Sequence, residues 1–247
     1  MEKAARDLLY SESPNWLNRS RIELMDSLLK NTPIVEGPLL EIGAGSGHAI
    51  EKLSKYGPVD AIDVAPESWP LIQQKPVRNL YTSAIPNDKI EENYSAIVGL
   101  EVLEHIKDDK LALQWLVDHL MPGGLLLLSV PAYSWLWGPH DIANHHFRRY
   151  TRSRLLKLLP SNLELVRSGY FMTALFPLAA IARLCYNAKN KTTEQGSMPI
   201  KQKSSLPYVV DLTFGKIMSV EAYLAGKGIS CPYGMTIYLF ARKPYHN

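Results

Sequence analysis

Short apolar runs alternate with segments of helical spacing along the first half of the chain. The runs at 38–42, 59–63, 77–85, 94–100 and 125–130 predict five strands, and the last is almost wholly apolar, as a strand buried on both faces requires. The clearest helical pattern spans residues 111–120 and ends at Met121-Pro-Gly-Gly124. Strands and helices that alternate through short connections predict an α/β fold, a doubly wound and mostly parallel sheet with helices on both faces.

A glycine-rich turn follows the first predicted strand directly. Gly43, Gly45 and Gly47 come after the apolar residues 38–42, and residues 48–55 have helical spacing. Because glycine lacks a Cβ atom, a strand, a glycine turn and a helix in this order let a nucleotide-like ligand lie against the backbone. The alternative is an ordinary tight turn between a strand and a helix.

Two carboxylates favour the ligand site over the ordinary turn. Glu41 stands two residues before the first glycine, and Asp63 ends the second predicted strand, where a carboxylate can hydrogen-bond a ribose diol. Ligands of doubly wound sheets bind outside the carboxyl ends of the strands, and Ser83 and Glu101 are predicted to lie at the same edge. Separate segments of the chain therefore converge on one crevice.

A long connection, residues 131–150, follows the fifth predicted strand. It is rich in aromatic side chains and contains His140, His145 and His146. Loops of this length either act in function or are disordered, and the aromatic content argues against disorder. We expect this loop to form the acceptor side of the site; the alternative is a lid packed by these side chains.

The histidines of this loop are the candidate catalytic residues. Histidine titrates near neutral pH, so His145 or His146 could act as a general base, and His140 beside Asp141 is a further candidate or half of an orienting pair. A carboxylate acceptor would need no base. We predict no metal site, because the loop has neither cysteine nor two histidines spaced four apart on a predicted helix.

The chain resembles the class I S-adenosylmethionine-dependent methyltransferases of the small-molecule type. The resemblance covers residues 15–172 and the final strand. It rests on Glu41-x-Gly-x-Gly-x-Gly47, Leu103-Glu-His-Ile106, a fifth strand ending in Val130-Pro131, and His146-Phe-Arg-Arg-Tyr-Thr151. It implies the strand order 3-2-1-4-5-7-6, with residues 163–172 and 234–242 as an antiparallel pair. Members of this subgroup often occur with glycan or lipid-linked sugar assembly.

The same resemblance implies S-adenosyl-L-methionine as the cofactor and assigns residues to it. Those implied to contact the cofactor are Glu41, Gly43, Ala44, Gly45, Gly47, Asp63, Ser83, Glu101, His105 and Arg21. His105 could instead brace the next helix, and Arg19 could replace Arg21. Ser83 and Ser95 stand where the family often has aspartate, so a cofactor-binding partner subunit without catalysis stays an alternative.

Residues 148–157 include five basic residues and no acidic one. This predicts either a solvated helix face or an anion site, because arginine forks and a helix N-terminus both favour phosphate or carboxylate. We expect Thr151 to cap the helix that follows. The residues expected to contact the acceptor are Trp16, Tyr133, Trp135, Trp137, Arg149 and Tyr150.

The whole chain, 1–247, is predicted to form one domain in four parts. These are an N-terminal helical lid (1–34), a cofactor-binding core (35–172), a helical insertion (173–233), and a final strand with a tail (234–247). The insertion joins an apolar segment to a basic stretch, residues 183–203, followed by a helix over 206–226. Such a segment can lie on an anionic membrane surface, cover the acceptor pocket or form a homodimer seam.

Composition sets limits on location and partners. The net charge of +3 gives no reason to expect a nucleic-acid partner. The start lacks the apolar core of a signal peptide, and the longest apolar run is shorter than the roughly 20 residues of a spanning helix. Cys185 and Cys231 form no paired motif. We therefore expect a cytoplasmic protein, with peripheral contact to the inner face of a membrane as an option.

The expected reaction is methyl transfer to a hydroxyl or amine of a small acceptor, anionic or lipid-linked. This is an in-line displacement at carbon with a good sulfonium leaving group, so the enzyme must align the reactants and supply a deprotonated nucleophile. Peptide or macromolecule methylation is the alternative.

Overall fold

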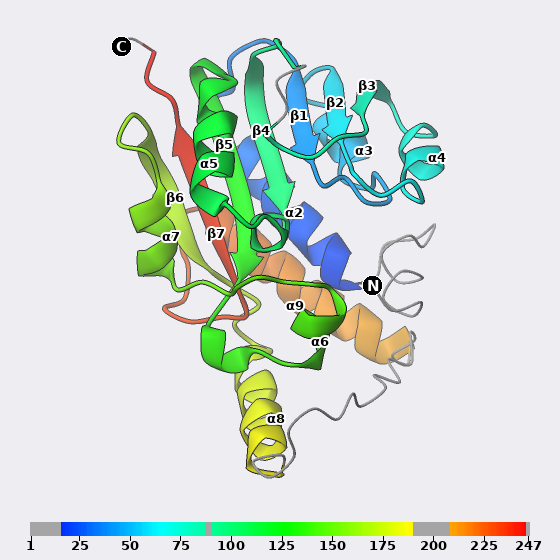
Figure 1. Ribbon diagram of the computed structural model, residues 1–247. Helices are drawn as coiled ribbons and strands as arrows, with labels where there is room; N and C mark the ends of the chain where they lie inside the picture. The colour runs from blue at the N-terminus through cyan, green and yellow to red at the C-terminus, as the bar shows by residue number, and fades with distance from the viewer. Residues whose placement is uncertain (1–15, 87–89, 190–207, 246–247) are drawn as a thin grey trace.

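A seven-stranded sheet forms the centre of the molecule in the computed structural model, which describes residues 16–86, 90–189 and 208–245 (Figure 1). Its order, β3-β2-β1-β4-β5-β7-β6, confirms the prediction. The strands β1 to β5 pair in parallel, and β7 is antiparallel to both neighbours. Their bounds are β1 (Leu39–Ile42), β2 (Val59–Ile62), β3 (Val77–Tyr81), β4 (Tyr94–Leu100), β5 (Leu120–Pro131), β6 (Glu164–Phe171) and β7 (Thr236–Arg242).

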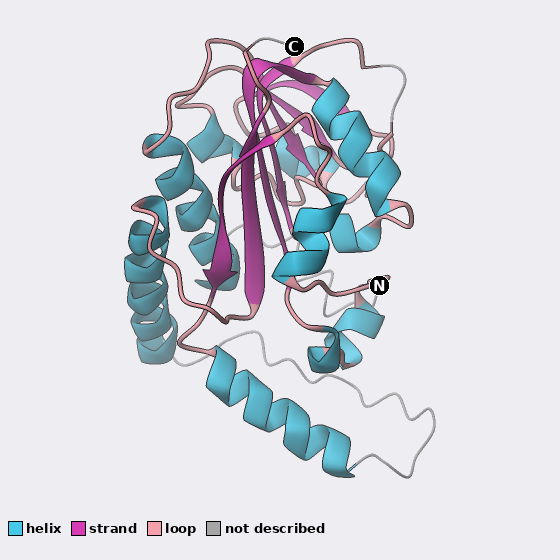
Figure 2. Ribbon diagram, turned by 90° about the vertical axis from the view of Figure 1, so that its left-hand side faces the viewer, coloured by secondary structure: helices cyan, strands magenta, loops and turns pink. Residues whose placement is uncertain are grey.

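Helices cover both faces of this sheet, as the two views in Figures 1 and 2 show. The α-helices are α2 (Trp16–Lys30), α3 (Ile50–Leu53), α4 (Trp69–Ile72), α5 (Asp109–Asp118), α6 (Pro139–Ala143), α7 (Arg152–Leu158), α8 (Phe176–Lys189) and α9 (Tyr208–Gly226). Two 3-10 turns, η1 (Leu103–His105) and η2 (Ser134–Leu136), follow β4 and β5.

The core consists of two apolar clusters, one on each face of the sheet. Successive strand residues point to opposite faces, so Leu39 belongs to the cluster beneath α2 and α9, and Leu40 belongs to the cluster beneath α5 and α7. Residues 125–128 of β5 alternate between the clusters in the same way. The strand is therefore buried on both faces, as its apolar run predicts.

The helix from the predicted insertion packs against the helix from the N-terminal leader. Met218 and Ala222 of α9 are buried in the cluster that contains Met25 and Leu28 of α2. The Ser219 hydroxyl donates a hydrogen bond of 2.6 Å to the Glu23 carboxylate across this seam. By contrast, α8 projects away from the sheet in both views (Figures 1 and 2).

Local sequence signals explain several element ends, and one expectation is corrected. Thr151 caps α7 as predicted, because its hydroxyl accepts a hydrogen bond from the Arg154 amide. The segment 121–124 was expected to end a helix; instead α5 ends at Asp118 and β5 begins at Leu120. The backbone of Gly123 and Gly124 pairs with that of Lys243, just beyond β7, which extends β5 toward its N-terminus.

None of the helices in the described part of the chain combines the length and the apolar character needed to cross a bilayer.

An ion pair between the buried Asp60 and the exposed Arg78 joins β2 to the edge strand β3. Asp60 is fully buried, and its carboxylate accepts hydrogen bonds from Arg78 Nε at 2.8 Å and Nη2 at 2.7 Å. Asn79 Nδ2 and the Tyr94 hydroxyl donate to the same carboxylate, each at 3.1 Å. Glu92 is a second, more exposed partner of Arg78 at 3.1 Å.

Replacing Asp60→Asn should lower the free energy of unfolding by about 3 kcal/mol, because it removes the buried anion that accepts hydrogen bonds from Arg78, Asn79 and Tyr94. Urea denaturation measures this change. The matched control is Glu92→Gln, which removes the exposed partner of the same arginine and should cost less than about 1 kcal/mol. If both variants lose the same free energy of unfolding, the larger contribution assigned to the Asp60–Arg78 pair is wrong.

Candidate active site

A cavity lies at the carboxyl ends of β1 and β4, where the chain turns repeatedly. It is bounded by α2, by the glycine turn after β1, by the turn after β4 and by the loop after β5. The residues that line it are Leu17, Asn18, Arg21, Ile22, Glu41, Gly43, Ala44, Gly45, Ser46, His48, Ala49, Leu100, Glu101, Glu104, His105, His140, Asn144 and His146. A cavity is therefore present at the predicted edge of the sheet; of the residues expected there, Gly43, Gly45 and Glu101 line it, whereas Gly47, Asp63 and Ser83 do not.

The glycine turn has the backbone shape that its sequence requires. Gly43, Gly45 and Gly47 all have positive φ angles, between 55° and 72°, a region that side chains disfavour. A Cβ atom on Gly43 would lie 2.5 Å from Val102 Cγ2, whereas one on Gly45 would meet no atom within 4 Å. Gly43 is thus needed for close packing, and Gly45 presents bare backbone to open space.

Asp63 anchors this turn from the end of β2. Its Oδ2 atom accepts a hydrogen bond of 2.7 Å from the Gly45 amide, and its Oδ1 atom accepts one of 2.9 Å from the Ala65 amide. Asp63 is buried and is not among the cavity-lining residues. Its contact with a ribose stays a prediction, while its support of the turn is observed.

Glu41 places a buried carboxyl group beside the turn. The residue is only 4% exposed, and its Oε2 atom has no hydrogen-bond partner among the described residues. Burial, followed by the nearby charge of Asp63, raises the pKa of Glu41 from an ordinary 4.5 to about 8. This carboxyl is therefore ready to ionise when a positive group enters the cavity.

Arg21 and Glu101 form an ion pair across the cavity wall. Arg21 Nη2 lies 3.0 Å from Glu101 Oε2, so α2 supplies Arg21, and not Arg19, to the cavity. Glu101 has a φ of 58°, an uncommon backbone conformation for a residue other than glycine. Its amide donates to the Ser129 carbonyl at 3.0 Å, and this contact with β5 holds the conformation in place.

A fully buried carboxylate, Asp141, organises the loop after β5. Asp141 Oδ1 accepts hydrogen bonds from His146 Nδ1 at 2.9 Å and from Arg149 Nε at 2.7 Å, and Oδ2 accepts one from the Gly138 amide at 2.8 Å. Burial opposes ionisation, but the bonds from His146 and Arg149 prevail and lower the pKa of Asp141 to about 2. Asp141 is therefore ionised at neutral pH.

This arrangement selects one of the candidate histidines. Because His146 donates through Nδ1 to a carboxylate, its Nε2 atom keeps a lone pair, and the side chain lines the cavity. His145 does not line the cavity. The expectation that His140 and Asp141 form an orienting pair is wrong, because Asp141 bonds His146 instead.

His105 and His140 also line the cavity, near His146. The ring centres of His105 and His140 lie 4.6 Å and 6.1 Å from that of His146. Surrounding protein atoms, followed by repulsion from His146, lower the pKa of both residues to about 4, although each keeps part of its surface exposed. Both rings are therefore neutral at pH 7.

The residues predicted to contact the acceptor lie outside this cavity. Tyr133 stacks on Tyr170 at 5.4 Å, and Trp135 and Phe176 join the same aromatic group. Trp16 packs against Phe214 at 5.8 Å. Neither Trp137 nor Ser83 is among the lining residues.

Two of these expectations are corrected by burial. Tyr150 lies in the core, fully buried, with its hydroxyl bonded to Asp109 at 3.0 Å. The Arg149 guanidinium is bonded to Asp141 and to the Ala132 carbonyl, so it supports the loop and is not an open anion site.

Glu104 is an ionisable cavity residue that sequence reasoning missed, as it missed the polar lining residues Asn18, Ser46, His48 and Asn144. Glu104 is fully buried, and neither carboxylate oxygen has a hydrogen-bond partner in the described part of the chain. Burial, followed by the nearby charge of Glu101, raises the pKa of Glu104 well above its ordinary value. The available signal was an acid on the short turn after β4, three residues beyond Glu101 and next to His105.

Comparisons with known proteins identify the family and the fold. A family model described as a methyltransferase domain matches residues 17–171. The ubiquinone biosynthesis O-methyltransferase of Xylella fastidiosa is 31% identical over 116 residues. This match covers 42% of this chain and 46% of that protein, which is less than half of its length. The mitochondrial ubiquinone biosynthesis O-methyltransferase of Schizosaccharomyces pombe is 24% identical over 250 residues, 92% of this chain and 77% of that protein.

A solved structure shares the fold over nearly its whole length. The N-methyltransferase NodS from Bradyrhizobium japonicum WM9, in complex with S-adenosyl-L-homocysteine, matches with a TM-score of 0.59 and 17% identity. The match covers 97% of this chain and 96% of that one.

The raised pKa of Glu41 predicts a pH dependence of stability. Between an ordinary pKa of 4.5 and a folded value of about 8, the folded state binds more protons than the unfolded state. The contribution of Glu41 to the free energy of unfolding should therefore fall by about 1.4 kcal/mol per pH unit as the pH rises through this window.

Glutamine has no proton to release, so the Glu41→Gln variant avoids the cost of a buried negative charge. The variant should therefore gain stability relative to the wild type as the pH rises. Urea unfolding of both proteins at about pH 5.5 and about pH 7.5 tests this. A stability difference that stays constant across this range would contradict the prediction.

Proposed function

We propose that this chain, which belongs to the methyltransferase-domain family and is an S-adenosylmethionine-dependent methyltransferase, transfers a methyl group to a hydroxyl or amine of a small acceptor. One observation carries the proposal: His146, oriented by Asp141, lines the same cavity as the glycine turn. A proton acceptor and a place for the methyl donor thus share one space.

The walls of the cavity suit a donor that bears positive charge. S-adenosylmethionine has a sulfonium and an ammonium group, and Glu41, Glu101 and Glu104 line the cavity. Gly45 offers backbone against which the cofactor can lie, and we propose Arg21 as the partner of its carboxylate. Desolvation strengthens such charge interactions relative to water.

The proposed chemistry needs one proton transfer and one displacement. His146 Nε2 takes the proton from the acceptor hydroxyl or ammonium, and the ionised Asp141 stabilises the resulting imidazolium. The acceptor atom then forms a bond to the methyl carbon while the carbon–sulfur bond breaks in line. S-adenosylhomocysteine leaves as a neutral thioether, and His146 returns its proton to solvent.

The curated relatives support a hydroxyl acceptor. Both are ubiquinone biosynthesis O-methyltransferases, so oxygen is the atom to test first. An anionic acceptor loses its expected support, because Arg149 is paired with Asp141 and Arg148 is paired with Asp109 at 2.7 Å.

A lipid-linked acceptor is supported by the outer surface of α8. Leu178, Ile181 and Leu184 are each 60% or more exposed on a helix that stands away from the sheet (Figure 2). The sequence that follows α8 is basic up to residue 203. Exposed apolar side chains beside basic residues suit the surface of an anionic membrane, where such acceptors reside.

Substituting His146→Gln should reduce methyl transfer at least about a hundredfold and leave S-adenosylmethionine affinity within about threefold, because the cofactor needs no base. Label transfer from methyl-labelled S-adenosylmethionine into soluble and lipid extracts measures the first quantity, and calorimetry measures the second. His145→Asn is the matched comparison, since asparagine tolerates the positive φ at this position.

The His145 variant should retain label transfer. If the His145 variant loses label transfer and the His146 variant keeps it, then His145, and not His146, is the general base. Full transfer in both variants would remove the base from the mechanism. Failure of the wild type to bind either S-adenosylmethionine or S-adenosylhomocysteine would count against the cofactor site itself.

A double substitution on α8, Leu178→Gln with Ile181→Gln, should abolish sedimentation of the protein with vesicles that contain phosphatidylglycerol. The control is Val220→Gln on α9, which changes a side chain of similar exposure and should leave sedimentation intact. A wild type that stays in the supernatant at low salt would contradict the membrane role of α8.

A further inference from the structure

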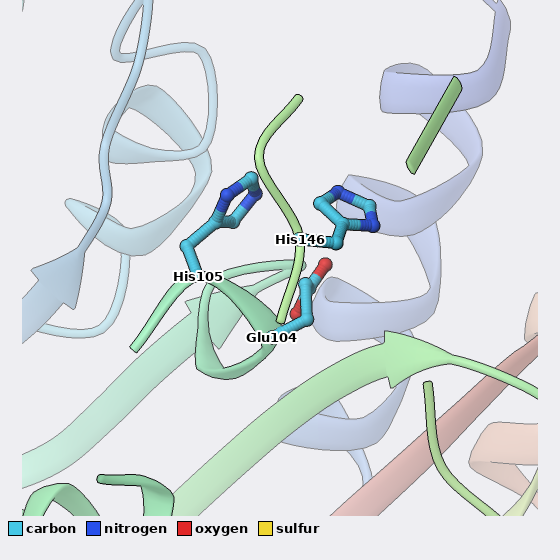
Figure 3. Close-up of side chains that lie close together, drawn as sticks. All are labelled: Glu104, His105 and His146. Atoms are coloured by element: carbon cyan, nitrogen blue, oxygen red, sulfur yellow. The ribbon is translucent and has the colours of Figure 1, made fainter. Parts of the chain in front are cut away.

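Three side chains with metal-binding atoms meet at one wall of the cavity. Glu104 and His105 lie on the turn after β4, and His146 lies on the separate loop after β5 (Figure 3). One ligand atom from each residue lies within 4.8 Å of the others. The backbone joins the two segments, because the Phe147 amide donates to the Glu104 carbonyl at 2.8 Å.

Within this cluster, the Glu104 carboxyl group is left without a hydrogen-bond partner among the described residues. Its side chain is fully buried, and neither of its oxygens accepts a hydrogen bond within the described residues. A buried carboxyl group without a partner is costly, and proteins retain such a group where it binds a ligand. Two imidazoles beside a carboxylate form a donor set for a cation.

We propose that Glu104, His105 and His146 bind a divalent transition-metal ion of the Zn²⁺ type. Two imidazole nitrogens and one carboxylate oxygen are the protein ligands of many catalytic zinc sites, which keep further positions open. Mg²⁺ and Ca²⁺ prefer oxygen ligands, so the two nitrogens disfavour them. The ion fits between the three ligand atoms after small side-chain rotations, since each bond to it spans about 2.0–2.2 Å.

Asp141 supplies the outer contact that such sites use. A histidine that binds a metal through one nitrogen commonly donates the other N–H to a carboxylate, which fixes the tautomer and the ring orientation. His146 donates through Nδ1 to Asp141 Oδ1 at 2.9 Å, so Nε2 is the ligand atom. The buried Arg149 in turn holds Asp141 at 2.7 Å.

This site rests on the proposed methyl transfer for its role, though not for its existence, and it replaces the general base of that proposal by an ion that activates the acceptor. With the ion bound, the acceptor oxygen coordinates at an open position and loses its proton to water, because the ion lowers the pKa of the bound hydroxyl. The oxygen then attacks the methyl carbon and the carbon–sulfur bond breaks. The ion keeps its oxidation state throughout, and His146 acts as a ligand in place of a base.

Metal titration of the full chain tests the site without any acceptor. Protein dialysed against a chelator should bind one Zn²⁺ per chain in calorimetry, and Co²⁺ should give visible absorption bands of a nitrogen and oxygen site. Glu104→Gln and His146→Gln should each weaken Zn²⁺ binding at least about tenfold, as should Asp141→Asn through loss of the outer contact. His145→Asn should bind as the wild type does.

Because Glu104 is buried, its variant needs a check of folding, and the exposed His105 offers His105→Gln as a second test that leaves the core intact. No Zn²⁺ binding by the wild type, or equal binding by the His105 and His145 variants, would overturn the metal site. If label transfer depends on His146 but continues after complete removal of metal, the ion has no role in the reaction. The methyltransferase mechanism with His146 as the base would then stand. Metal binding without any label transfer would instead count against the proposed acceptor chemistry.

Discussion

The parallel pairing of β1 with β2 on one side and β4 on the other is the constraint on which the site depends. Ile42 pairs with Ile62 in β2 and with Gly99 in β4, so the three strands end at nearly the same level. The segments that follow them must therefore turn at a single edge of the sheet. The glycine turn, Asp63 and the η1 turn owe their proximity to this register, although they are distant in sequence.

Acidic side chains at the same edge of the sheet add a second constraint on what the site can bind. Acidic side chains at three of these turns are buried or half-buried, and Arg21 balances only Glu101 by direct contact. Glu41 and Glu104 each have at least one buried oxygen without a partner. A cavity built this way favours positively charged ligands, a class that includes both a sulfonium donor and the proposed metal ion.

The sequence predicted the structure well where neighbouring residues determine it. It predicted the structure badly where a contact between distant residues determines it. Strand periodicity predicted the strands of the sheet, and the glycine pattern predicted the turn that lines the cavity, because both depend on neighbouring residues. The pairing of Asp141 with His146 was not predictable from spacing, since consecutive residues of α6 point in directions about 100° apart and Asp141 bonds His146 from beyond the end of the helix. Likewise, nothing local distinguishes the buried Tyr150 from an aromatic side chain that would face an acceptor.

The packing of α9 on α2 has a consequence for synthesis of the chain. Glu23 and Ser219 are 196 positions apart, yet they share a hydrogen bond in this seam. The ribosome releases the apolar face of α2 long before the residues of α9 that cover it, and domains fold as their segments emerge. Leu17 and Arg21 on α2 therefore complete the cavity wall late, so a nascent chain exposes apolar surface that chaperones recognise until translation passes residue 226.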